Sequence, residues 1–255
     1  MDIVLAEWTK LRTLRSTMVS LLLTLVVGVG LTYLLGRTLH TALSNGTLRG
    51  IGPFDPLFAA FYGLTIAQLA VVVFGVLAVG SEHGSGTIRA SLVAVPRRGA
   101  FYGGKLLAAA LPVALVGLAT VGLSFVAARA ALGPYRPALD AEAARTAVGG
   151  VLYLVLICLL AMGVTAMLRS SVLALAILTP LLFLGSQGLG NVPRVRAVTQ
   201  YLPDQAGSLI MHVVGPPDDP GFPRSYGPWT GMAIMALWTA VAVAGGYLTL
   251  RRRDP

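Results

Sequence analysis

Residues 99–106 read Gly-Ala-Phe-Tyr-Gly-Gly-Lys-Leu and nearly match the phosphate-binding loop Gly-x-x-x-x-Gly-Lys-[Ser/Thr]. In that loop the backbone amides hold phosphate oxygens, the lysine reaches the terminal phosphates and the hydroxyl binds magnesium. Leu106 has no hydroxyl, and no strand is expected before the loop. We therefore predict no nucleotide site here, and expect the ammonium of Lys105 to extend toward the membrane surface.

The other residue types that could do chemistry are few and badly spaced. Ser124 lies in a motif faintly similar to that of membrane serine proteases, yet every histidine lies in a connection, so its hydroxyl has no base. We interpret Ser124 as a helix-packing residue. No metal-ligand spacing is found among His40, His83, His212 and Cys158. The sequence thus predicts no enzyme, and no metal or cofactor bound by this chain.

The composition of the 255 residues excludes most soluble enzymes. Charged residues make up 11%, less than half of the roughly 25% in ordinary globular chains, and hydrophobic residues make up 56%. So few charges cannot cover a water-exposed surface, which indicates a membrane protein. The net charge of +9 would suggest a nucleic-acid partner for a soluble domain. Here we expect no nucleic acid and take the charge as a signal of membrane orientation.

Six stretches are long enough to cross a bilayer as helices, since about 20 apolar residues span a hydrocarbon core of about 30 Å. None of the six contains Asp, Glu, Lys, Arg or His. We predict an all-α polytopic membrane protein, one permease domain over residues 1–255. Its expected spans are residues 17–36, 57–80, 106–128, 146–168, 172–190 and 229–250.

An even number of spans places both termini on one side, and the basic residues indicate which side. With the termini cytoplasmic, the inner segments hold 11 of the 19 lysines and arginines and carry a net charge of +7, against +2 outside. We therefore expect a multi-pass protein of the cell membrane with both termini cytoplasmic.

The residues ahead of the first span predict a short amphipathic helix in the headgroup layer. Val4, Trp8 and Leu11 recur at helical spacing, while Lys10 and Arg12 fall elsewhere on the helical wheel. Trp8 suits that depth. We expect Trp8, Lys10 and Arg12 to belong to an interfacial elbow; a disordered tail is the alternative.

The outer connection, residues 191–228, contains seven prolines and a second helical pattern. Apolar residues repeat at helical spacing after Asp204, a plausible N-cap. They are Ala206, Leu209, Ile210 and Val213. We predict short extracellular re-entrant helices that rest on the outer face or dip into it; an irregular proline-rich loop is the alternative.

The inner connection, residues 81–105, is unusually apolar for a cytoplasmic loop. Ile88, Leu92 and Val95 recur at i, i+4 and i+7, and Pro96 ends the pattern. An apolar helix face outside the membrane must be buried against headgroups, the bundle or another protein. This connection is therefore the candidate docking segment.

Three segments of the chain carry a family resemblance. Residues 82–89, Glu-His-Gly-Ser-Gly-Thr-Ile-Arg, followed by Arg97 and Arg98, resemble the cytoplasmic coupling segment of ABC-transporter permeases of the second exporter type. Residues 7–13 resemble the interfacial elbow of that family, and residues 246–253 its last span and basic tail. Because the six spans and the long outer connection also match, the resemblance covers nearly the whole chain.

This resemblance implies a permease that dimerises, or pairs with a sister permease, while a separate ABC ATPase subunit binds ATP and magnesium. Glu82 and the helix after it would lie in a groove of the ATPase, so that nucleotide-driven closure tilts the spans. The arginines would meet acidic groups or anionic lipid, or simply follow the positive-inside bias. The implied coupling residues are Glu82, His83, Gly84, Gly86, Thr87, Ile88, Arg89, Leu92, Pro96, Arg97 and Arg98.

The cargo is indicated only by polar side chains inside the spans. Gln68 and Gln187 should turn toward a partner helix or an aqueous cavity, as packing residues or as substrate contacts. Spans with so few polar groups favour an apolar or amphipathic cargo such as a drug, lipid or peptide. A non-transporting membrane anchor and a sodium-coupled secondary transporter are the alternatives.

Overall fold

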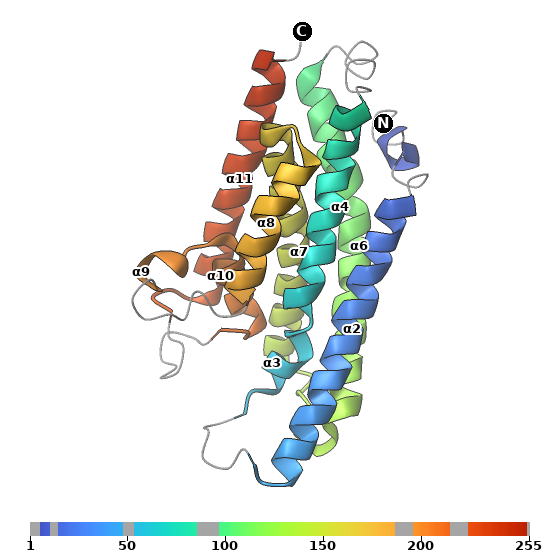
Figure 1. Ribbon diagram of the computed structural model, residues 1–255. Helices are drawn as coiled ribbons and strands as arrows, with labels where there is room; N and C mark the ends of the chain where they lie inside the picture. The colour runs from blue at the N-terminus through green and yellow to red at the C-terminus, as the bar shows by residue number, and fades with distance from the viewer. Residues whose placement is uncertain are drawn as a thin grey trace.

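The computed structural model describes residues 6–10, 15–47, 54–85, 97–186, 196–214 and 224–253. All regular structure in these ranges is helical, which confirms the predicted all-α class. The long helices run side by side as a bundle, and both marked chain ends lie at the same end of it (Figure 1). We call this the terminal end of the bundle and the opposite one the distal end.

Five helical segments are long and apolar enough to cross a membrane. Four are single helices, and one is formed by a short helix followed by a long one. They are α2 (Arg15–Ser44), α3 (Pro56–Phe61) with α4 (Leu64–Ser85), α6 (Arg98–Leu132), α7 (Ala141–Leu168) and α11 (Pro228–Arg253). The expected multi-pass helical character is therefore confirmed for five of the six predicted spans.

The predicted span at residues 172–190 is not confirmed. Its helix, α8 (Ser171–Ser186), has 16 residues, which rise about 24 Å and fall short of a hydrocarbon core of about 30 Å. Residues 187–195 lie outside the described ranges. The chain reverses tightly before this helix, because Arg169 adopts the left-handed conformation (φ 55°) and donates its N–H to Thr165 O, ending α7.

The outer connection contains the expected short helices. They are α9 (Arg196–Thr199), α10 (Pro203–Ser208) and the 3-10 turn η3 (Leu209–Met211). The expected N-cap was wrong: Leu202 is the N-cap of α10, because Pro203 takes the first helical position and moves Asp204 into the first turn. Whether these helices re-enter the membrane stays a prediction.

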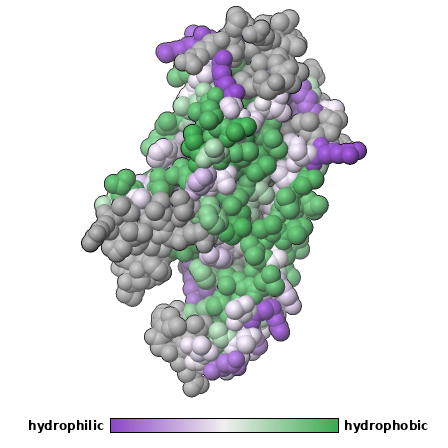
Figure 2. All heavy atoms as spheres, viewed as in Figure 1, coloured by the Kyte–Doolittle hydropathy of each residue, from purple (hydrophilic) through white to green (hydrophobic). Residues whose placement is uncertain are grey.

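Helix α7 lies at the centre of the bundle and packs against α4, α6, α8 and α11. Its inner face carries fully buried side chains such as Tyr153, Leu154 and Ile157. In contrast, α2, α6 and α11 expose many large apolar side chains, which only a membrane or a partner chain would cover. On the face that Figure 2 shows, apolar residues cover the middle of the bundle and hydrophilic residues lie toward its ends.

Candidate functional site

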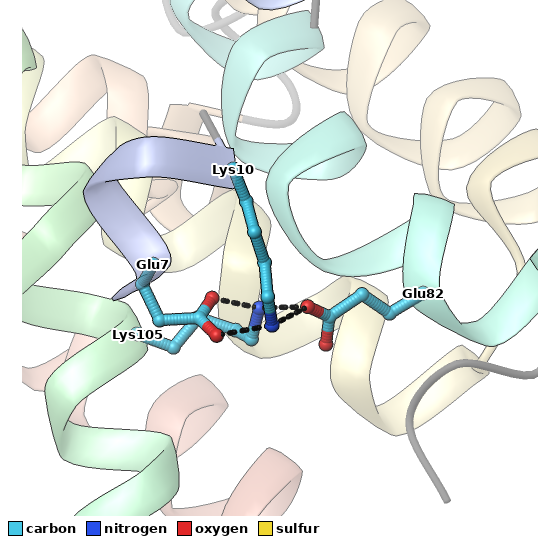
Figure 3. Close-up of polar contacts among 4 residues, drawn as sticks. All are labelled: Glu7, Lys10, Glu82 and Lys105. Atoms are coloured by element: carbon cyan, nitrogen blue, oxygen red, sulfur yellow. Dashed lines mark hydrogen bonds and ion pairs between the residues drawn. The ribbon is translucent and has the colours of Figure 1, made fainter. Parts of the chain in front are cut away.

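Four charged side chains from three separate parts of the chain meet at the terminal end (Figure 3). Glu7 and Lys10 come from the helical turn at residues 6–10, Glu82 from the last turn of α4, and Lys105 from the second turn of α6. We call these four residues the ion network. Two carboxylates and two ammonium groups give it no net charge.

The distances join all four residues into one network. Lys105 Nζ donates to Glu7 Oε2 at 2.5 Å and lies 2.9 Å from Glu82 Oε1. Lys10 Nζ donates to Glu7 Oε1 at 2.6 Å and to Glu82 Oε1 at 3.0 Å. Each lysine is therefore paired with both glutamates, and Glu82 Oε1 lies beside both ammonium groups.

The ion network is buried apart from one lysine. Glu7, Glu82 and Lys105 are 4%, 7% and 5% exposed, whereas Lys10 is exposed. The expectation that Lys105 extends to the membrane surface was wrong, because its ammonium turns inward to the carboxylates and lies 5.5 Å from the centre of the Phe101 ring. Charges buried to this degree are tolerated when opposite charges lie next to them.

The pKa shifts of Glu7 and Lys10 both favour the ionised form of the side chain. Burial alone would raise the pKa of Glu7, but Lys105 and Lys10 outweigh it and leave that pKa lowered. Burial alone would lower the pKa of Lys10, but Glu7 and Glu82 outweigh it and leave that pKa raised. Both residues thus remain charged around neutral pH.

The ion network fastens the two ends of the inner connection to each other. Glu82, on α4, lies at the start of that connection and Lys105, on α6, is its last residue, while Glu7 and Lys10 add the N-terminal turn. One oxygen of Glu82, Oε2, is buried and has no partner among the described residues. A force on the inner connection would therefore reach α4, α6 and the N-terminal turn together.

The predicted coupling residues from Glu82 to Pro96 fall into three groups. Glu82 is an anchor inside the bundle, and contact of its carboxylate with an ATPase stays a prediction. His83 and Gly84 lie in the last turn of α4. The described ranges do not include Gly86, Thr87, Ile88, Arg89, Leu92 and Pro96.

Arg97 and Arg98 begin α6 and differ in environment. Arg97 is exposed and is the N-cap residue of α6. Arg98 Nη1 donates to Leu250 O at 3.0 Å and to Arg251 O at 2.9 Å. It thereby satisfies carbonyl groups that the end of α11 leaves without helical partners, and joins α6 to α11.

The predicted elbow residues overlap with the ion network. Lys10 lies in it, Trp8 is partly exposed beside it, and Arg12 lies outside the described ranges. Sequence reasoning missed the role of Glu7. The available signal was its i, i+3 spacing to Lys10, a spacing that brings opposite charges together on a helix.

Gln68 is fully buried and joins two helices. Its Nε2 donates to Thr65 O at 2.8 Å, and its Oε1 accepts from Tyr153 Oη at 2.5 Å. These bonds give Gln68 a packing role between α4 and α7, while substrate contact stays a prediction. Gln187 lies outside the described ranges.

Tyr153→Phe should lower the free energy of unfolding by about 0.6–2 kcal/mol, because it leaves Gln68 Oε1 without its donor between two apolar helices. Thermal unfolding in detergent measures the change. Tyr33→Phe is the matched control, since that ring on α2 is 46% exposed and its change should be close to zero. Equal stability of both variants would contradict the packing role of Gln68.

Within the ranges that the structure describes, no three His, Cys, Asp or Glu residues form a group that could hold a metal ion. No protein-family model and no curated protein matches this chain, so its function has to be inferred from its own residues and geometry.

Proposed function

We propose that this chain is the membrane-spanning permease subunit of an ATP-driven exporter of the second ABC type. A separate ABC ATPase subunit would bind ATP and magnesium, and a second copy or a sister permease would complete the translocation path. The cargo would be an apolar or amphipathic drug, lipid or peptide. The chain would lie in the cell membrane with both termini cytoplasmic.

The ion network is the observation that carries this proposal. A permease without a nucleotide site must receive mechanical work through a segment that is firmly joined to its spans. Here the two ends of the inner connection are held together by Glu82 and Lys105, 2.9 Å apart, and the N-terminal turn is fixed to both. Displacement of the connection would then tilt α4 and α6 as one body.

The number of spans and the position of the re-entrant segment are also part of this proposal. Helix α8 runs from the terminal end toward the distal end, and α11 returns to the terminal end (Figure 1). We count α8 with the following residues as the sixth span, and α9, α10 and η3 as the re-entrant segment on the outer side. The bundle would then contain six spans with both termini on the inner side.

The proposal is tested by expressing the chain together with a candidate ABC ATPase subunit and reconstituting both in liposomes. We expect ATP-dependent movement of an amphipathic fluorescent dye across the liposome membrane. Ile88→Asp, in the predicted docking face, should reduce both the copurified ATPase and the transport at least severalfold. Ala141→Asp adds the same charge to an exposed position at the distal end and should change neither.

Two results would contradict the proposal in different ways. Copurification without any nucleotide-dependent dye movement would favour a membrane anchor. ATPase binding that is unchanged by Ile88→Asp would remove the inner connection as the docking segment.

A further inference from the structure

A short segment at the distal end is packed deep into the bundle. Every residue of α10 and η3 is buried, and the segment contacts both α7 and α11. A Cβ on Gly207 would lie 2.7 Å from the Tyr153 ring, and a Cβ on Gly149 would lie 2.7 Å from Ile210. We call residues 203–212 the distal plug.

The end of the distal plug is held by His212. Its Nδ1 lies 2.7 Å from Asp55 Oδ2, before α3, and its Nε2 lies 3.6 Å from Glu142 Oε1, at the start of α7. A neutral imidazole has only one N–H, so it can offer a proton to only one of these carboxylates. Both contacts are favourable only when the ring is protonated.

The start of the distal plug holds a second group that can take up a proton. Asp204 is 1% exposed, and its Oδ2 accepts from Gln205 Nε2 at 3.2 Å. Its Oδ1 is buried and has no partner among the described residues. Arg224, which donates to Gln205 Oε1 at 2.9 Å, is the nearby cation. Burial of an oxygen that is not hydrogen-bonded disfavours the carboxylate relative to the neutral acid, compared with the same group in water.

We propose that the distal plug is a pH-operated gate element, docked in the bundle when His212 and Asp204 carry protons and released when they lose them. His212 and Asp204, which we call the two anchors of the plug, lie within one ten-residue segment. This segment has little helical stability of its own, since isolated short helices are unstable. The gate property concerns this chain alone and does not depend on the proposed ATPase partner.

The directions of the pKa shifts support the same sign for both anchors. The hydrogen bond to Asp55 raises the pKa of His212, against the effect of burial, and the charge of Glu142 adds to it. Burial raises the pKa of Asp204 to about 6, while Gln205 and Arg224 oppose the shift. Both groups therefore bind their proton more tightly in the docked state.

The pH window follows from these shifts. The docked state is favoured at low pH, and it loses the contribution of Asp204 as pH rises from about 4 through about 6. It loses the contribution of His212 as pH rises through a pKa above 6.5. Between pH 5 and 8.5, Asp204 alone should lower the ratio of docked to released plug about tenfold.

The other groups that face the anchors keep their charge across this window. Asp55 has a lowered pKa because the effect of His212 outweighs burial, and Arg224 remains a cation. Tyr226, whose pKa is raised to about 12 by burial, remains neutral. His212 and Asp204 are therefore the groups of the plug that lose a proton as the pH rises through this window.

The experiment uses the full chain in nanodiscs on a Cys158→Ala background, with spin labels at exposed positions 197 and 130. Electron-electron distance measurements at pH 5 should give one docked distance, and at pH 8.5 a second population. Asp204→Asn should keep the docked distance to higher pH, His212→Gln should release the plug at lower pH, and the double variant should not respond to pH. His40→Gln, a histidine outside the plug, is the control and should respond like the native chain.

Two outcomes would overturn the gate proposal. The first is the same distance distribution at pH 5 and pH 8.5 in the native chain. The second is a double variant that retains the native pH response, since the response would then belong to other groups. Neither outcome depends on ATP-driven transport, so failure of the gate and failure of the exporter proposal are distinguishable.

Discussion

Lys105→Met should lower the free energy of unfolding by about 3–5 kcal/mol, the largest effect that we expect from a single substitution in this chain. Within the ion network, the methionine leaves Glu7 without its cation at Oε2, and leaves Lys10 as the one remaining cation beside two buried carboxylates. Breaking a buried ion pair costs more than the pair contributes, because the remaining charge stays buried without compensation. Thermal unfolding in detergent at neutral pH measures the loss.

The control for this prediction is the other lysine of the ion network. The side chain of Lys10 is 46% exposed, so water screens its charges and Lys10→Met should have a much smaller effect than Lys105→Met. The double variant Glu7→Gln with Lys105→Met removes a carboxylate together with its cation. It should be more stable than the sum of the two single losses predicts.

Equal effects of Lys105→Met and Lys10→Met would contradict the buried network. The same variants also test the proposed role in coupling. If the network transmits force, Lys105→Met should lose ATP-dependent transport at a temperature where the chain is still folded and still binds the ATPase. Normal transport by folded Lys105→Met would limit the network to a structural role.

The sequence predicted the helices well because the signal is local. Runs of about 20 residues without a charge are rare outside membranes, and five of the six predicted runs lie in helices that can span one. The boundaries were less accurate, because a helix need not end where the hydrocarbon core does. Helix α6 begins at Arg98, eight residues before the predicted span, where that arginine bonds to the end of α11.

The candidate site was only partly predictable because its contacts are not local. Lys10 and Glu82 were predicted to face the membrane surface and a partner protein, yet they lie 3.0 Å apart. The residues of this pair are 72 positions apart in the chain, and no helical periodicity relates them.

Gly163→Ala should lower the free energy of unfolding by about 1–3 kcal/mol, because it places a methyl group where α7 and α11 touch through their backbones. A Cβ on Gly163 would lie 2.5 Å from the carbonyl carbon of Ala242 and 2.7 Å from Val243 N. Backbone atoms cannot rotate aside as a side chain can, so the two helices would have to separate.

Separation of these helices would disturb contacts along the whole crossing. Thr239 Oγ1 of α11 lies 3.3 Å from Leu156 O of α7, and a Cβ on Gly246 would lie 3.0 Å from Gly163 O. Between membrane helices, packing of this kind replaces the hydrophobic effect as the main source of association. The loss should therefore exceed the gain in helix propensity of about 0.5–1 kcal/mol that alanine brings over glycine.

Gly122→Ala is the matched control, since a Cβ at this position on α6 meets nothing within 4 Å. It should gain the helix propensity without the clash, so that the two substitutions shift the unfolding temperature in opposite directions. Unfolding in detergent, followed by circular dichroism, measures both shifts. A gain in stability for Gly163→Ala would mean that α7 and α11 do not approach as closely as described. The packing of α11, which carries the C-terminal end of the chain onto the bundle, would then need another explanation.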